Sequence, residues 1–127
     1  MVPFHLQLAR LGAFPDVAAP RVVWVGLGGD LDSLFQLQRA IEQALAPLGF
    51  APEARAFTSH LTLGRVREKA MAQERRRLGE MMASLVVSEQ PSLYVEQGSL
   101  MRSDLTARGA IYSRLAVVKL ALPKASQ

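Results

Sequence analysis

The chain has 127 residues, with 15 Lys and Arg against 11 Asp and Glu, a formal net charge of +4, half of its residues hydrophobic, and no cysteine. This length suits a single domain over residues 1–127, and the composition excludes a disordered chain, a disulfide framework and a thiolate metal site. No apolar run reaches the ~18 residues of a membrane helix and no signal peptide core is present, so we expect a soluble, cytoplasmic protein. The positive charge favours an anionic partner such as RNA but equally suits a solvated basic surface.

The first half of the chain predicts two strands and a helix. Apolar and polar residues alternate over residues 4–8, and a β-branched run with Trp24 covers residues 22–25, so the two segments predict a hairpin with a long loop. A helix is expected to begin at Asp30 or Asp32 and to end at Gly49, with Pro47 in its final turn. Its apolar residues at helical spacing are Leu34, Leu37, Ile41, Leu45 and Leu48.

The second half predicts a strand, a helix and two more strands. Alternation over residues 57–66 predicts a strand whose Leu61 and Leu63 face the core, and residues 68–85 predict an amphipathic helix. Strands are expected over residues 92–101 and 111–122. The order ββαβαββ predicts an α+β fold, with two long helices on one side of a mostly antiparallel sheet.

One short segment of the predicted strand 57–66 carries residues suited to chemistry on a phosphate. Residues two apart in a strand share a face, so His60 and Thr62 point the same way. Histidine can act as a general acid or base near neutral pH, and a threonine hydroxyl can donate to a phosphate oxygen. Arg65 would face the other way by strict alternation, unless a bulge at the preceding glycine returns it to the His60 face. Without context, a His-x-Thr in a strand is usually only a polar face.

The surrounding sequence gives that context. Residues 57–65, Phe-Thr-Ser-His-Leu-Thr-Leu-Gly-Arg, resemble the second His-x-Thr-x motif of the two-histidine (2H) phosphoesterase superfamily, in its RNA 2′,3′-cyclic phosphodiesterase branch, also called 2′-5′ RNA ligase or LigT-like. The resemblance extends over nearly the whole chain. The other matching segments are residues 4–8, 11–15 and 20–26, Gly49-Phe50, Leu100, Ser103, Leu105, Gly109-Ala110 and Tyr112.

The resemblance implies a bilobal fold in which two His-x-Thr-x motifs face each other across a phosphate, with no metal and no cofactor. Carried onto this chain, it makes His60 one of two acid/base histidines and Thr62 a phosphate ligand, with Arg65 as a cation on the phosphate side. In the implied reaction one histidine activates water and the other protonates the departing ribose oxygen. A terminal 2′,3′-cyclic phosphate is thereby opened to a 2′-phosphomonoester.

The sequence departs from the family pattern in two ways. Ser59 stands where the family usually has proline, which is a minor change. The family's first His-x-Thr-x motif lies upstream of Met1, and the other histidine, His5, is followed by Gln7 instead of threonine, so we expect His5 to be a polar-face strand residue. Part of one lobe is therefore expected to be missing. A fragment or misplaced start, a gene truncation, or a homodimer that brings two copies of His60 together would each explain this, and exposed strand edges should favour self-association.

Three functions remain open from the sequence. The first is an RNA 2′,3′-cyclic phosphodiesterase, with reversible 2′-5′ RNA ligase activity. The second is a catalytically incomplete module that binds RNA or a nucleotide phosphate through Thr62 and Arg65. The third is an enzyme of the same superfamily that acts on a different cyclic phosphate.

Overall fold

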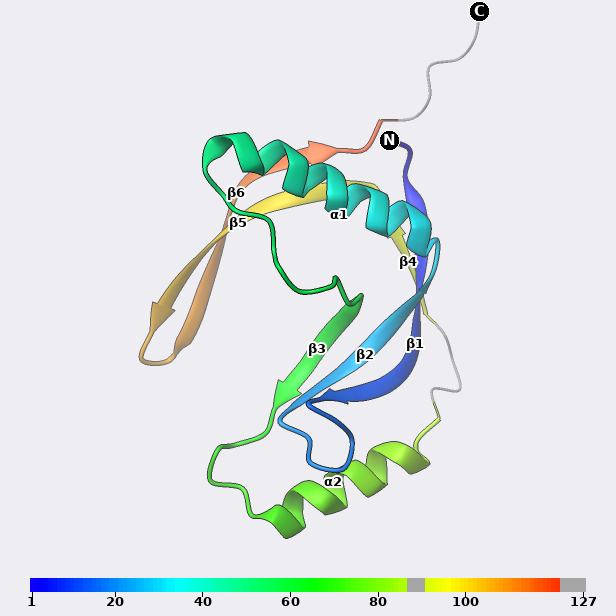
Figure 1. The fold of residues 1–127 in the computed structure, drawn as a ribbon, viewed down its shortest axis with the longest axis vertical. Coiled ribbons are helices and arrows are strands. Elements are labelled where there is room, and N and C mark those ends of the chain that lie inside the picture. Colours follow the sequence, from blue (N-terminus) through cyan, green and yellow to red (C-terminus); the bar gives the residue numbers. More distant parts are fainter. Residues whose placement is uncertain (87–90, 122–127) are drawn as a thin grey trace, which may run out of the picture. The chain divides into compact units, whose positions relative to one another are not determined.

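The computed structural model describes residues 1–86 and 91–121 of the chain. In chain order its elements are β1 (Phe4–Phe14), β2 (Val22–Gly29), α1 (Leu31–Leu45), the 3₁₀ helix η1 (Ala46–Leu48), β3 (His60–Arg65), α2 (Ala72–Ser84), β4 (Ser92–Val95), β5 (Gln97–Thr106) and β6 (Gly109–Lys119) (Figure 1). The predicted α+β class, with two long helices and antiparallel strand pairs, is confirmed. The strand predicted over 92–101 is instead divided between β4 and β5, and Leu122, the predicted last residue of the final strand, lies outside the described residues.

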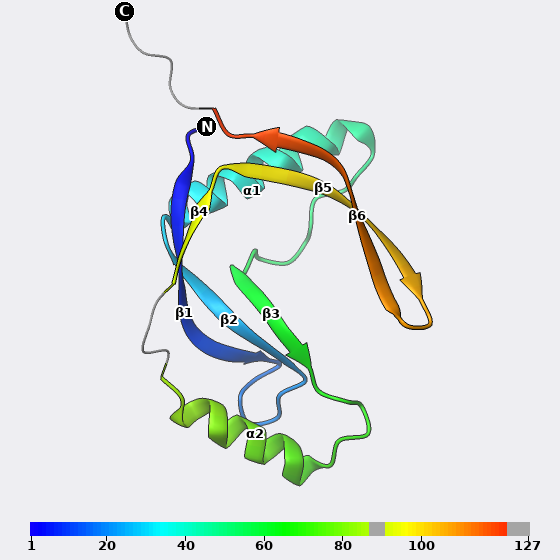
Figure 2. The same ribbon diagram turned by 180° about the vertical axis from the view of Figure 1, so that it is seen from behind.

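The chain divides into two compact units, Leu6–Leu93 and Met1–His5 with Tyr94–Gln127. Four strands form one sheet in the order β3-β2-β1-β4, and β5 and β6 form a two-stranded sheet of their own. The view from behind shows β5 and β6 as one long ribbon (Figure 2). The single domain expected from chain length stays a prediction.

The predicted hairpin is the β1–β2 pair, and its two faces differ in character. Leu11 lies opposite Val25 and Ala13 opposite Val23. Opposite residues of an antiparallel pair share a face, so these four apolar side chains lie together on one face of the pair. Val25 and Ala13 are 4% and 6% exposed, which makes this the core face. The other face carries Gly12, Phe14 and Trp24.

A glycine ends the first helix, and another glycine lets the second helix pack closely against a loop. The predicted first helix continues from α1 into η1, where Pro47 is accommodated, and ends at Gly49 with φ of 97°. Asp30 is its N-cap residue by position, although its side chain makes no capping hydrogen bond. Helix α2 lies against the β1–β2 loop, because a Cβ built on Gly79 would overlap the carbonyl oxygen of Val17 (Figure 1). Neither helix is long and apolar enough to cross a membrane.

Two expectations about individual side chains are wrong. Leu61 and Leu63 are not buried in the core, since they are 44% and 60% exposed; Leu61 does lie opposite Val25 on the core face, but β3 is an edge strand of the sheet. Consecutive arginines on a helix are more often a solvated face, so the sequence predicts that Arg75, Arg76 and Arg77 are exposed. The Arg75 guanidinium instead donates to the carbonyl oxygens of Pro20 and Arg67 at 3.1 and 2.8 Å, and only Arg76 and Arg77 are exposed.

Candidate active site

Strand β3 carries a bulge that decides which way its polar side chains point. In the register with β2, Trp24 lies opposite Thr62 and Val23 lies opposite Gly64, so Leu63 is an extra residue without a partner. An extra residue in one strand shifts the alternation of every residue after it. The sequence indicated only that Gly64 would permit such a bulge.

The bulge brings His60, Thr62 and Arg65 onto one face of the sheet. They lie opposite Gly26, Trp24 and Val22, which are alternate residues of β2. Since opposite residues share a face, all three side chains project from the face that carries Trp24, on the side away from Val25 and Ala13. Along the strand, neighbouring members of the set are about 7 Å apart. His60, Thr62 and Arg65 therefore form a row on one face of the sheet.

The proton position on His60 is fixed by the backbone. Nδ1 lies 2.6 Å from the carbonyl oxygen of Thr58. A carbonyl oxygen only accepts hydrogen bonds, so Nδ1 carries a proton and donates it to this bond. In the neutral ring Nε2 then has a free lone pair. Nε2 is the atom of this side chain that can take up or release a proton towards a substrate.

Two aromatic rings on the same face of the sheet contact the imidazole of His60. The ring of Phe14 stands edge-on to it, with centroids 5.1 Å apart and planes at 89°, and the ring of Trp24 lies 6.0 Å away. Phe14 and Trp24 also contact each other, at 5.3 Å. These distances are typical of favourable aromatic pairs. The imidazole is thereby restrained on one side by apolar rings and at Nδ1 by a carbonyl.

Phe14 and Trp24 are site residues that the sequence reasoning missed. From sequence alone, Trp24 is predicted to be a core or rim residue, and Phe14 has no predicted role beyond the family resemblance. The signal that could have found them is the close fit of Gly12 to Trp24, since a Cβ built on Gly12 would overlap the indole ring. A glycine opposite a tryptophan in a hairpin indicates that the large ring lies across the neighbouring strand.

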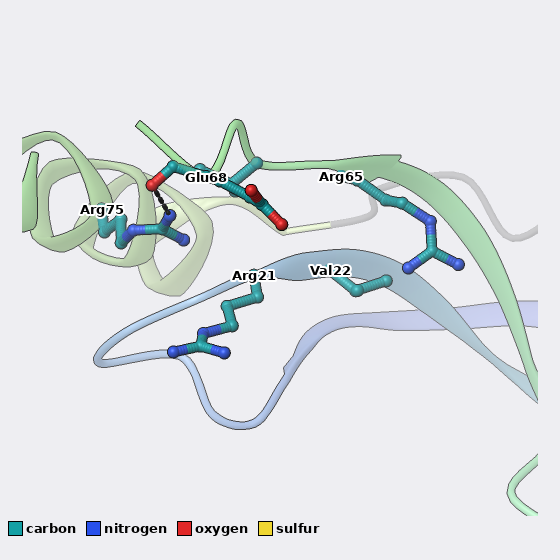
Figure 3. A pocket seen from close by; sticks show the side chains of 6 residues that line it. Arg21, Val22, Arg65, Glu68 and Arg75 are labelled. Carbon is teal, nitrogen blue, oxygen red and sulfur yellow. Dashed lines mark hydrogen bonds between the residues drawn. The ribbon is translucent and has the colours of Figure 1, made fainter. Parts of the chain in front are cut away.

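Thr62 and Arg65 lie open to solvent, while His60 is partly buried. Arg65 lines an open cavity with Arg21, Val22 and Glu68, as the close view shows (Figure 3). The other histidine, His5, is in β1 and its ring contacts that of Tyr94 at 4.8 Å. Within the described residues no cluster of three or more His, Cys, Asp and Glu side chains is arranged to hold a metal ion.

Comparison with known proteins identifies the family. The sequence profile of the LigT like Phosphoesterase family matches residues 29–112, a span that includes β3 and its His-x-Thr segment. The chain belongs to this family. The resemblance inferred from residues 57–65 is thus confirmed, and LigT-like is a sound description of the fold.

Individual relatives agree with this assignment. The chain is 37% identical to an RNA 2′,3′-cyclic phosphodiesterase of Aeropyrum pernix, over 93% of this chain and 65% of the relative. It is 36% identical to an RNA 2′,3′-cyclic phosphodiesterase of Methanothermobacter thermautotrophicus, over 93% and 61%. The crystal structure of a Thermus thermophilus protein is similar with a TM-score of 0.64 and 25% identity, over 94% of this chain and 61% of that one. The LigT-like chain therefore spans less than two thirds of the length of these relatives.

Proposed function

We propose that this protein acts as an RNA 2′,3′-cyclic phosphodiesterase that hydrolyses a terminal 2′,3′-cyclic phosphate to a 2′-phosphomonoester, and that it also has reversible 2′-5′ RNA ligase activity. The observation that carries the proposal is the common face of His60, Thr62 and Arg65 on the bulged strand β3. Membership of the LigT-like family and relatives named for this activity support it.

His60 would transfer protons through Nε2. When water attacks the phosphorus, one acid–base group takes the proton from the water and another gives a proton to the 3′ oxygen as its bond to phosphorus breaks. The ring of His60 suits either step, because Nδ1 is committed to the Thr58 carbonyl and only Nε2 is left to exchange a proton. The contacts with Phe14 and Trp24 would limit rotation of the ring during the transfer.

Thr62 and Arg65 would hold the phosphate. A hydroxyl donor and a guanidinium on the imidazole face can bind the non-bridging oxygens, which gain negative charge as water adds to the phosphorus. A proton-transfer imidazole, a hydroxyl and a guanidinium supply this chemistry without a bound cation, so we expect catalysis to be independent of metal. The RNA substrate and the lack of cysteine fit the cytoplasm as the place of action.

The reaction needs a second acid–base group. In these 127 residues His60 is followed at the second position by threonine, whereas His5 is followed by Gln7. With a single histidine, the rate would be lower by roughly 10²- to 10⁴-fold, which is the contribution of one acid–base group. This observation favours a second candidate function for the isolated chain, a module that binds RNA phosphate through Thr62 and Arg65 without turnover. A homodimer would supply the second group as another copy of His60.

The test compares two histidine variants on an oligoribonucleotide that ends in a 2′,3′-cyclic phosphate, with a metal chelator present throughout. We expect the wild-type chain to release the 2′-phosphomonoester and His60→Ala to lose at least 10²-fold in kcat/KM. His5→Ala is the matched control and should keep the wild-type value, because the ring of His5 contacts that of Tyr94 and His5 is followed by Gln7 instead of threonine. Full activity of His60→Ala would refute the proposal. Binding of the oligonucleotide without turnover would select the binding module.

A further inference from the structure

A positively lined cavity lies beside the candidate site, within the compact unit Leu6–Leu93. It is open to solvent, has a volume of about 510 Å³, and is formed where β2 begins, β3 ends and the chain runs towards α2. Its lining residues are Arg21, Val22, Arg65, Val66, Glu68 and Arg75 (Figure 3). Three of the six side chains are thus guanidinium groups, against one carboxylate.

Three guanidinium groups against one carboxylate leave the lining of this cavity with a formal charge of +2. None of Arg21, Arg65, Glu68 and Arg75 makes a salt bridge to a partner in residues 1–86 or 91–121, where the ion pair found joins Arg102 to Asp104. Burying or gathering like charges without a counter-charge is unfavourable, whereas an added anion would be attracted by all three arginines. A phosphate group, which guanidinium donors match in geometry, is the anion best suited to such a lining.

Arg75 gives the cavity a fixed wall. Its guanidinium donates to the carbonyl oxygens of Pro20 at 3.1 Å, Arg67 at 2.8 Å and Glu68 at 3.3 Å. These bonds connect the start of α2 to the segments before β2 and after β3. They involve neutral carbonyl groups, so Arg75 keeps its net positive charge while its position is held. The fold therefore fixes one of the three arginines of the cavity, while Arg21, Arg65 and Glu68 are exposed.

The strand register gives the distance between the cavity and the imidazole of His60. Val22 and Arg65 lie opposite each other on the face that carries His60, and His60 lies opposite Gly26, four residues further along β2. At about 3.3 Å per residue, the cavity begins about 13 Å from the imidazole along the sheet. A stacked nucleic acid strand advances about 3.4 Å per nucleotide. A stacked strand with its cyclic phosphate at His60 would thus place a phosphodiester about four nucleotides away, beside Arg21, while Arg65 keeps its role as a ligand of the cyclic phosphate.

We propose that this cavity binds an internal phosphodiester of the RNA on the 5′ side of the cyclic end, and so makes the enzyme prefer an oligonucleotide to a cyclic mononucleotide. The inference rests on the proposed function for the identity of the ligand. A 2′,3′-cyclic phosphate terminates the strand, so every other phosphate of the substrate lies on its 5′ side. Arg21 is the residue of the cavity that contacts the internal phosphodiester. Arg75 holds the wall of the cavity in place, and the carboxylate of Glu68 weakens phosphate binding.

The experiment measures two quantities for four forms of the 127-residue chain. One is the affinity for a labelled oligoribonucleotide with a 2′-phosphate end, by fluorescence anisotropy at several salt concentrations, which needs no turnover. The other is kcat/KM for an oligonucleotide and for a mononucleotide that both carry a 2′,3′-cyclic phosphate. The forms are wild type, Arg21→Gln, Glu68→Gln and Arg76→Gln. Arg76 is exposed on α2 and controls for net charge. Thermal unfolding checks that each variant is folded.

The proposal expects opposite effects from the two cavity variants. Arg21→Gln should weaken oligonucleotide binding about three- to tenfold and reduce the slope of log K against log salt by about 0.7, the value for one phosphate contact on a single strand. Glu68→Gln should tighten binding, and Arg76→Gln should change it by less than Arg21→Gln. Where turnover is measurable, Arg21→Gln should lower kcat/KM for the oligonucleotide and leave the mononucleotide unchanged.

Two results would overturn the inference without touching the proposed function. They are wild-type oligonucleotide affinity in Arg21→Gln, and an equal loss on mononucleotide and oligonucleotide. If no form hydrolyses either substrate, the proposed function fails for this chain. The anisotropy measurements would still test whether the cavity binds RNA. Weaker binding by Arg21→Gln together with tighter binding by Glu68→Gln would support the proposal, and equal affinities would refute it.

Discussion

Thr58 and Thr62 stand on either side of His60 in the chain, and the structure gives them different tasks. Thr58 contributes its backbone carbonyl, which fixes the proton on Nδ1 of the imidazole. Thr62 contributes its side chain, which projects from the same face as His60. The two residues therefore form a matched pair, in which only one hydroxyl is expected to matter for substrate.

Replacing Thr62 by valine keeps the shape of the side chain and removes the hydroxyl donor. We expect Thr62→Val to lower kcat/KM for a cyclic-phosphate oligonucleotide by about 10- to 10³-fold, since a lost donor to a developing oxyanion costs up to that much. Thr58→Val should leave kcat/KM near the wild-type value, because it retains the carbonyl that holds His60. Steady-state kinetics on both variants checks this. Equal losses in the two variants would mean that Thr62 acts only through the strand.

Gly12 is predicted to control the position of His60 through Trp24. A Cβ on Gly12 would overlap the indole ring, and the indole contacts the imidazole. Gly12→Ala should therefore displace Trp24, lower the free energy of unfolding by about 1–3 kcal/mol and lower kcat more than it raises KM. Gly28→Ala in β2 is the control, because nothing lies within 4 Å of its added Cβ. Urea unfolding and kinetics of both variants provide the readouts. Wild-type stability of Gly12→Ala would contradict the overlap.

Residue patterns predicted the common orientation of His60 and Thr62 but not the surroundings of the arginines. Alternation in a strand fixes which residues share a face, so the pair could be inferred from residue spacing alone. Arg75, Arg76 and Arg77 are identical in type and consecutive in sequence, and only the packing of α2 turns Arg75 towards the Pro20 carbonyl. Charge runs are usually solvated, and that generalisation fits Arg76 and Arg77 but fails for Arg75.

At the scale of elements, β3 shows where sequence periodicity stops being informative. Alternation predicted the strand, and Gly64 permitted a bulge, but the extra residue is Leu63 and its place is set by the pairing of Trp24 with Thr62 and Val23 with Gly64. Pairing register depends on the partner strand, so it is not contained in the strand's own pattern. The division of the expected strand 92–101 at Glu96 has the same origin, since β4 and β5 belong to different sheets.

The contact between α2 and the β1–β2 loop leads to a prediction at this scale. In an open helix position Gly→Ala would stabilise by about 1 kcal/mol. At Gly79 the new methyl group would meet the backbone carbonyl of Val17, which cannot rotate away as a side chain can. We expect Gly79→Ala to lower the free energy of unfolding by about 1–3 kcal/mol despite its helix propensity.

The control for Gly79 is Gln73→Ala, at an exposed position of the same helix. It should change the free energy of unfolding by no more than about 0.5 kcal/mol. Midpoints of urea unfolding for the two variants test the pair. A stabilised Gly79→Ala protein would show that the helix can move away from the loop at little cost.

At the scale of the whole molecule, the β5–β6 ribbon has apolar side chains on both faces. Ser103 lies opposite Tyr112 and Leu105 opposite Ala110, so Tyr112 and Leu105 share one face, while Leu100 and Val118 lie on the other. These four side chains are 62% to 86% exposed. A solvated hairpin usually has one polar face, whereas apolar residues on both faces are typical of strands that are covered on both sides. Each strand of the ribbon also has an outer edge with no strand partner in the described residues.

We therefore expect the 127-residue chain to associate with itself through this ribbon, since exposed edges and apolar patches favour pairing between chains. Light scattering after size exclusion should show a mass above that of the 13.9 kDa monomer at micromolar concentration. The double variant Leu105→Lys with Val118→Lys places one charge on each face and should shift the mass towards the monomer. Both positions are highly exposed, at 86% and 69%, so the variant should keep its circular dichroism spectrum.

A matched double variant at Arg76 and Arg77, each to Gln, lies on α2 and should leave the association unchanged. A wild-type chain that remains monomeric at every concentration would show that the two apolar faces are covered within one chain. An unchanged mass in the lysine variant would place the association elsewhere.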